Sequence, residues 1–99
     1  MNYRLLSVAE EDLADAARYY ERQSKGLGTE FLDEFEAAIR RVCQFPDGWR
    51  AISERHRRCP FRRFPFAVLY TMEDRTVVVS GVMDLRIDPG RQRSRMRDT

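Results

Sequence analysis

The chain has 99 residues, of which 42% are hydrophobic and 34% are charged. This length suits one small domain, and the apolar share is large enough for a core, so the composition excludes an intrinsically disordered chain. No apolar run approaches the roughly 18 residues that cross a membrane, and the acidic residues from Glu10 onward leave no room for a signal-peptide core. We therefore expect one domain over residues 1–99 in the cytoplasm.

The formal net charge of +2 hides an uneven distribution of charge. Residues 1–48 contain six basic and ten acidic groups, for a net charge of −4. Residues 49–99 contain twelve arginines, no lysine and six acidic groups, for a net charge of +6. Such a basic half indicates an anionic partner, either an acidic protein, which we favour from composition, or a nucleic acid.

Neither a metal nor a cofactor is expected from the sequence. The two cysteines, Cys43 and Cys59, do not form a disulfide framework by count or spacing, and we predict that both are reduced and packed as small core residues. A single histidine, His56, argues against a histidine-based zinc site. The sequence contains no glycine-rich phosphate loop and no nucleophile elbow.

The first half of the chain predicts a short strand over residues 2–6 and then a helix over residues 8–24. Ser7 and Glu10 match a capping box at the start of that helix. Apolar residues at positions 13, 16, 17 and 20 follow helical spacing. Gly26 and Gly28 interrupt the pattern, which indicates the end of the helix.

A second helix is predicted over residues 27–45. Its apolar residues again recur at helical spacing, and the sequence Pro-Asp-Gly at 46–48 ends it. The connection between the two helices is short, so we expect an αα-hairpin whose apolar stripes face a common core. The carboxylates Asp33, Glu34 and Glu36 are interpreted as a solvated helix face.

The second half of the chain favours strands. Runs of β-branched and aromatic residues at 66–72 and 76–82 flank a turn at 73–75 and predict a hairpin. Residues 49–53 and 55–61 are shorter, weaker strand segments, and a polar Arg-rich tail covers about residues 90–99. The predicted fold class is α+β: an N-terminal strand, an αα-hairpin and a three-stranded antiparallel sheet, in the order β-α-α-β-β-β. The first strand should lie at a sheet edge or join the sheet out of sequence order.

Arginines crowd the segment between residues 50 and 63 and alternate there with aromatic side chains. Guanidinium groups bind phosphate and carboxylate, and exposed aromatic rings can stack on unpaired bases. The alternatives are a solvated strand face, or arginine stems that cover apolar surface. The residues concerned are Arg50, Arg55, Arg57, Arg58, Arg62 and Arg63, with Trp49, His56, Phe61 and Phe64.

Three segments together resemble the ParE-type toxins of the RelE/ParE superfamily of bacterial type II toxin–antitoxin systems, also called plasmid stabilisation proteins. The likeness covers about residues 3–90 and includes the β-α-α-β-β-β element order. The segments are Ala9-x-x-Asp12-Leu13-x-x-Ala16-x-x-Tyr19-Tyr20-Glu21 with Gly26-Leu27-Gly28-x-x-Phe31 and Phe45-Pro46, then Arg63-Phe64-Pro65-Phe66-Ala67-Val68-Leu69-Tyr70, and Val82-Met83-Asp84-Leu85-Arg86-Ile87-Asp88-Pro89.

This resemblance implies a small toxin that is neutralised by a cognate antitoxin, in a hetero-oligomer. ParE-like members inhibit DNA gyrase by a protein–protein contact, whereas RelE-like members are ribosome-dependent mRNA endonucleases. Ala67 stands where the nucleases have a catalytic arginine, and no tyrosine follows Tyr70. We therefore favour the gyrase inhibitor, with no catalytic residues expected. If the chain is a ribonuclease, the resemblance points to Arg58, Arg62 and Arg86.

The sequence also departs from the ParE pattern. Asp84 stands for the usual histidine, Ile87 for an arginine, and Gly90 begins the segment that replaces an aromatic pair. A degenerate, non-toxic module that binds an antitoxin is therefore a third alternative.

The partner surfaces follow from the same resemblance. Target contact is assigned to Arg63, Arg86, Arg91 and Arg93. An antitoxin helix is expected in a groove of the helical hairpin, and a sheet edge can accept an added strand. Core packing is the alternative for Phe31, Phe35 and Phe66, whereas Tyr19 and Trp49 are expected to be exposed. The residues assigned to antitoxin binding are Leu13, Ala17, Tyr20, Phe31, Phe35 and Trp49.

Overall fold

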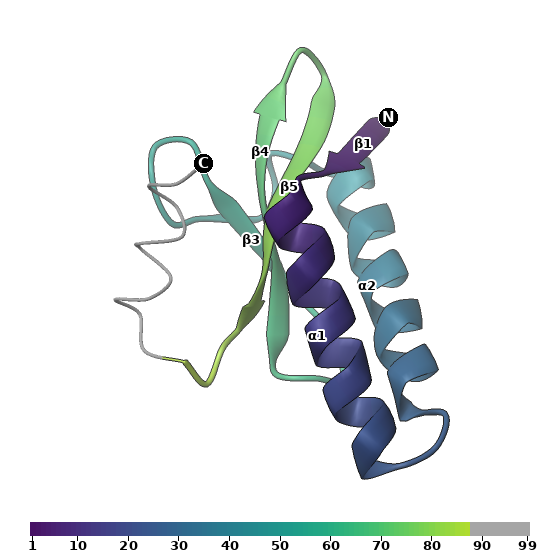
Figure 1. Cartoon of the computed structure of the whole chain (residues 1–99). Coiled ribbons are helices and arrows are strands. Elements are labelled where there is room, and N and C mark those ends of the chain that lie inside the picture. The colour runs from purple at the N-terminus through teal and green to yellow at the C-terminus, as the bar shows by residue number, and fades with distance from the viewer. Residues whose placement is uncertain (88–99) are drawn as a thin grey trace.

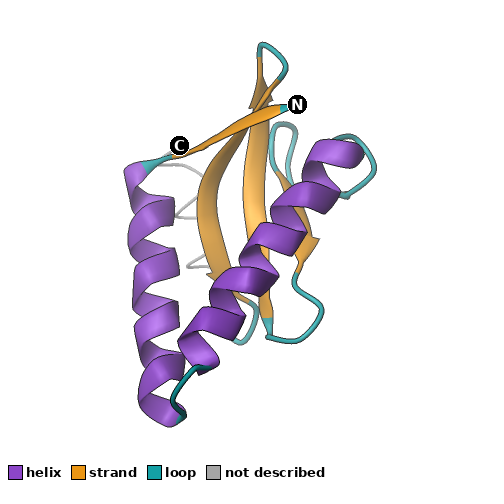
Figure 2. Cartoon of the chain, turned by 90° about the vertical axis from the view of Figure 1, so that its right-hand side faces the viewer, coloured by secondary structure: helices purple, strands orange, loops and turns teal. Residues whose placement is uncertain are grey.

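Two helices pack on one face of a five-stranded mixed sheet in the computed structural model, which describes residues 1–87 (Figures 1 and 2). The α+β class is as predicted, and the Arg-rich tail predicted over 90–99 lies outside the described residues. The helices are α1 (Ser7–Gln23) and α2 (Leu27–Gln44). The strands are β1 (Asn2–Leu5), β2 (Arg50–Ala51), β3 (Arg57–Pro60), β4 (Phe66–Glu73) and β5 (Thr76–Asp84).

The sheet has the strand order β1-β5-β4-β3-β2, with β1 parallel to β5 and all other pairs antiparallel. The expectation of a three-stranded antiparallel sheet is therefore wrong in detail. The segment at 49–53 does form a strand, although a short one, and the first strand joins at an edge beside the last. A parallel pair needs a long connection, and here both helices and strands β2 to β4 lie between β1 and β5 in the chain. The pattern of one short strand does not reveal such a distant partner.

Helix α1 begins directly after β1. The Leu6 N–H donates to the Val79 carbonyl at 3.0 Å, and the Leu6 carbonyl accepts from the N–H groups of Ala9 and Glu10 at 2.9 and 3.1 Å. Leu6 is thus the N-cap, and no side chain caps the helix. The predicted capping box does not form, because the last bond to β5 holds Leu6 extended and makes Ser7 the first helical residue.

The turn between the helices is tied together by one carboxylate. Glu21 of α1 accepts hydrogen bonds from the N–H groups of Gly26 and Gly28, each at a shortest distance of 3.0 Å. Gly26 has a φ of 90°, in the left-handed region that favours glycine. These contacts position the start of α2 against the end of α1, as an αα-hairpin.

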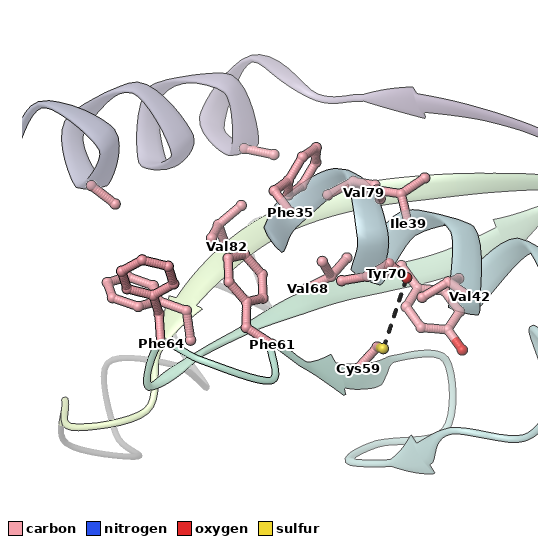
Figure 3. Packing of buried hydrophobic residues seen from close by; sticks show 14 of the residues in the cluster. Phe35, Ile39, Val42, Cys59, Phe61, Phe64, Val68, Tyr70, Val79 and Val82 are labelled. Carbon is pink, nitrogen blue, oxygen red and sulfur yellow. Dashed lines mark hydrogen bonds between the residues drawn. The ribbon is translucent and has the colours of Figure 1, made fainter. Parts of the chain in front are cut away.

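The core lies between the helices and the sheet (Figure 3). Tyr70 is fully buried and donates its hydroxyl proton to the Pro46 carbonyl at 2.5 Å, and burial raises the pKa of Tyr70 to about 12. Cys59 is buried, Cys43 is partly buried, and both are free thiols, as predicted. Other members of the core include Phe31, Phe35, Ile39 and Val42 from α2, and Val68, Val77, Val79 and Val82 from the sheet.

Candidate interaction surfaces

A cleft of about 630 Å³ lies between α1 and the second half of β5, and we call it the α1–β5 cleft. Apolar side chains and backbone form part of its lining, and three carboxylates, one tyrosine and one arginine supply its polar groups. It is lined by Asp12, Asp15, Ala16, Tyr19, Phe66, Gly81, Val82, Met83, Asp84, Arg86 and Ile87.

The cleft exists because β1 is shorter than β5. Strand β1 pairs with β5 only as far as Val79. The next residue, Ser80, has no opposite residue in β4 and forms a β-bulge. Beyond this bulge, the Val82 N–H points to α1 and donates to the Asp12 carboxylate at 3.0 Å. Asp12 thus takes the place of the carbonyl of a neighbouring strand. No strand within residues 1–87 pairs with this part of the β5 edge.

Asp84 and Arg86 form a bidentate ion pair at the end of the cleft. The Arg86 Nε and one terminal nitrogen donate to the two carboxylate oxygens of Asp84 at 3.0 and 2.9 Å. These hydrogen bonds lower the pKa of Asp84 and raise that of Arg86. The guanidinium group also lies 5.9 Å from the centre of the Phe66 ring, on the helix side of the sheet. Arg86 is therefore held in place, and its charge is already balanced.

Arg63 lies over Phe64, 5.6 Å from the ring centre, and pairs with Glu30 at 2.9 Å. The Tyr20 ring contacts both Phe64 and Phe66, with centroid distances of 4.7 and 6.0 Å. One aromatic cluster therefore links Arg63 and Arg86, the two arginines within the described residues that the sequence analysis assigns to target contact. The other two, Arg91 and Arg93, lie outside the described residues.

The six residues assigned to antitoxin binding do not line one groove. Phe31 is fully buried and Phe35 is 4% exposed, so both are core residues and offer no surface to a partner. Leu13, Ala17 and Tyr20 are partly buried and pack against the same core. The apolar faces of both helices pack against the sheet, so they do not form a groove on the surface.

Trp49, expected to be exposed, is also partly buried against the core. Its Nε1 donates to the Arg41 carbonyl at 3.3 Å, and its own carbonyl accepts from Arg57 at 2.7 Å. These hydrogen bonds hold the connection between α2 and β2 against the end of α2 and the start of β3. Tyr19 is 43% exposed, as expected, and lines the α1–β5 cleft.

The three arginines suggested for a ribonuclease do not come together. Arg58 is paired with Leu69, so it points away from the helices, whereas Arg86 lies over Phe66 on the helix side. Arg62 is in the exposed loop between β3 and β4. Ala67 is fully buried.

Two carboxylates beside these surfaces accept backbone hydrogen bonds that the sequence pattern does not predict. Asp12 caps the open edge of β5, and Glu34 accepts from the N–H groups of Arg62 and Arg63 at 3.0 and 2.9 Å. Asp12 belongs to the family pattern, but its hydrogen-bond partner, Val82, is 70 residues away in the sequence.

Within residues 1–87 no cluster of histidine, cysteine or acidic side chains could hold a metal ion, and neither helix is long and apolar enough to cross a membrane.

Comparisons with known proteins agree with this architecture. The model of a family described as the ParE toxin of type II toxin-antitoxin system, parDE, matches residues 3–89. A solved structure described as the chromosomal ParDE TA system from P. aeruginosa aligns with a TM-score of 0.75. The alignment covers 86% of this chain and 96% of that chain at 12% sequence identity, so it supports the fold alone. No curated protein matches the sequence. Because the family model spans most of the chain, this protein belongs to the ParE toxin family of type II toxin–antitoxin systems.

Proposed function

We propose that this protein is a cytoplasmic toxin that inhibits DNA gyrase through a protein–protein contact and is neutralised by a cognate antitoxin. The observation that carries the choice of a contact over a cleavage reaction is the placement of the arginines. Arg58 and Arg86 lie on opposite faces of the sheet, so they do not converge on one phosphate. Cleavage of a phosphodiester requires such convergence, together with a group that transfers protons.

The state of Arg86 supports the same proposal. Its guanidinium group is engaged by both oxygens of Asp84, which leaves little charge to stabilise a developing phosphorane. A partly exposed, rigidly held guanidinium beside aromatic rings is instead a typical anchor of protein–protein interfaces. We assign the target contact to this end of the molecule, with Arg63 and Arg86 as its described members.

We assign the antitoxin contact to the α1–β5 cleft. The cleft combines apolar lining with a strand edge that no described strand covers, and these two features suit an extended segment that folds on binding. Of the two aromatic residues that line the cleft, Tyr19 is 43% exposed and Phe66 is buried, so Tyr19 is the ring that such a partner can contact. Phe31 and Phe35 are not part of this surface.

Gyrase inhibition is tested by DNA supercoiling with the purified chain, an Arg86→Gln variant and an Arg75→Gln control. Arg75 is exposed in the turn between β4 and β5 and has no part in the proposed contact. We expect inhibition by the original chain, an inhibitory concentration about tenfold higher for Arg86→Gln, and no change for Arg75→Gln. A folded protein that leaves supercoiling untouched at every dose contradicts the proposal.

Two alternatives are separated by expression in cells. Transcripts cut at codons within ribosomes would show the ribonuclease, with Arg58 on the helix-free face as the first arginine to substitute. Harmless overexpression would instead show a non-toxic module that only binds an antitoxin.

A further inference from the structure

The hairpin of β2 and β3, residues 50–58, carries four arginines and one acidic residue. We call it the basic hairpin. Within residues 1–87, the four ion pairs use Arg4, Arg18, Arg63 and Arg86, and none of these arginines belongs to the hairpin. Arg57 is engaged by the Trp49 carbonyl. The hairpin therefore presents positive charge that no carboxylate of the described chain balances by an ion pair.

Two of these arginines are cross-strand neighbours. Arg50 and Arg58 are directly opposite each other across β2 and β3. Such residues lie on the same face with their Cβ atoms about 5 Å apart, and like charges in that position destabilise a sheet. Arg58 is also opposite Leu69, which is on the face without helices. Arg50 is exposed and Arg58 is partly exposed. Two arginines that are directly opposite each other and reach solvent are an arrangement that an anion can bridge.

Strand β2 is the last strand of the sheet, and its outer edge is open within the described residues. The Ile52 N–H donates to the His56 carbonyl at 2.9 Å. Because every second residue of an antiparallel strand bonds to the same neighbour, the backbone groups of Arg50 also face β3. The N–H and carbonyl groups of Ala51 then face outward. An extended segment can pair with them, although the shortness of β2 limits the backbone bonds to a few.

The aromatic side chains near the hairpin argue against nucleic acid. Trp49 is partly buried, and His56, Phe61 and Phe64 are 7%, 6% and 9% exposed. None of them offers a face on which an unpaired base could stack, which is the usual device of proteins that bind single strands. The exposed chemistry is guanidinium groups beside a strand edge, and this combination suits carboxylates on an extended peptide.

We propose that the basic hairpin binds an extended acidic segment of a protein partner, added along the outer edge of β2, with carboxylates bridging Arg50 and Arg58. This surface is separate from the α1–β5 cleft, which is lined by α1, β5 and the ends of their neighbours. The proposal does not depend on gyrase being the target.

The test uses the whole chain and two labelled probes: a synthetic peptide of alternating glutamate and valine, and a single-stranded DNA oligonucleotide of equal charge. Fluorescence anisotropy at low salt measures their binding. We expect the peptide to bind more tightly than the DNA. An Arg50→Gln/Arg58→Gln double variant should weaken peptide binding about tenfold or more. The matched control, Arg22→Gln/Arg40→Gln, removes the same charge from exposed helix positions and should have little effect.

Three outcomes would overturn the proposal. Equal weakening by the control variant would show that only net charge matters. Tighter binding of the DNA, dependent on Arg50 and Arg58, would assign the face to nucleic acid. Absence of peptide binding at low salt would leave the surface without this partner. Should the double variant not fold, the Ala51 amide signal of the original chain decides: a shift on adding peptide supports edge pairing, and an unchanged signal contradicts it.

Discussion

The distance between the two helices depends on a single missing methyl group. A Cβ atom on Gly28 would lie 2.6 Å from the Ala17 carbonyl oxygen, which belongs to the backbone of α1 and cannot rotate away. The Gly28 N–H also donates to Glu21. Glycine at this position therefore allows a close approach of α1 and α2 that any other residue would prevent.

We expect Gly28→Ala to destabilise the protein, although alanine favours helices by about 1 kcal/mol over glycine. Overpacking against a backbone atom costs about 1–3 kcal/mol, so the clash outweighs the gain in helix propensity. Urea denaturation measures the free energy of unfolding. Thr29→Ala, at an exposed neighbouring position of α2, is the control and should be neutral or stabilising. A Gly28→Ala variant that is more stable than the original would contradict the close approach.

His56 makes the stability of the β2–β3 turn sensitive to pH. Its side chain is 7% exposed, and its Nδ1 lies 3.2 Å from the Ser53 hydroxyl, which also accepts the His56 N–H. Burial, and then the charge of Arg55, lower the pKa of His56 from its ordinary value of 6.5. The folded chain therefore binds the proton less readily than the unfolded chain.

The sign of the effect follows from this difference in proton binding. The unfolded state takes up more protons as the pH falls through about 6.5, so the free energy of unfolding should decrease between about pH 7 and pH 5. The lowered pKa of Asp84 acts in a separate window, near and below its ordinary value of 3.8. A His56→Gln variant should show a flatter profile from pH 7 to about pH 5 in urea denaturation. Identical slopes for both chains would contradict the assignment to His56.

Helix α2 holds the loop between β3 and β4 in place. One oxygen of Glu34 accepts from the N–H groups of Arg62 and Arg63, and Glu30, one turn earlier, pairs with the Arg63 guanidinium. The interpretation of Glu34 as part of a solvated face was therefore wrong, while Asp33 and Glu36 are exposed. A helix carboxylate that binds two loop amides fixes where β4 begins, and so where Phe64 and Phe66 enter the core.

Glu34→Ala should lower the free energy of unfolding by about 1–3 kcal/mol, because two loop amides lose a charged acceptor. Asp33→Ala is the matched control on the same helix turn, and an exposed substitution of this kind should stay within about 0.5 kcal/mol. Hydrogen exchange at the Arg62 and Arg63 amides gives a second measurement and should accelerate only in the Glu34 variant. Unchanged exchange would show that the loop is held by other contacts.

The α1–β5 cleft and the basic hairpin are separate surfaces of the protein. The cleft borders the uncovered part of β5, whereas the hairpin forms the far edge of the sheet at β2. Sites without shared partners contribute additively to binding and stability.

Arg86 lines the cleft and is also a member of the proposed target contact, so its separation from the basic hairpin gives a cross-test. Arg86→Gln should weaken gyrase inhibition and leave binding of an acidic peptide unchanged, while Arg50→Gln/Arg58→Gln should do the reverse. The supercoiling and anisotropy assays measure the two effects on the same protein preparations. A loss of both activities in either variant, with unchanged stability, would mean that one continuous surface serves both partners.

Local sequence patterns were enough to predict the type of most elements and the family. Helical spacing predicted α1 and α2, β-branched runs predicted β4 and β5 around a turn that the structure places at Asp74 and Arg75, and the family model matches residues 3–89. These signals are local, because the period of apolar residues depends only on how each segment exposes its own side chains.

Which segments contact each other, in contrast, depends on the three-dimensional fold. The pairing of β1 with β5, the hydrogen bond from Val82 to Asp12 and the burial of Trp49 each join residues that no local pattern connects. Likewise, no local pattern predicts that Arg58 and Arg86 lie on opposite faces of the sheet. Side chains alternate between the faces of a strand, and one bulge changes which groups point outward, so the face of a residue depends on the register of the whole sheet.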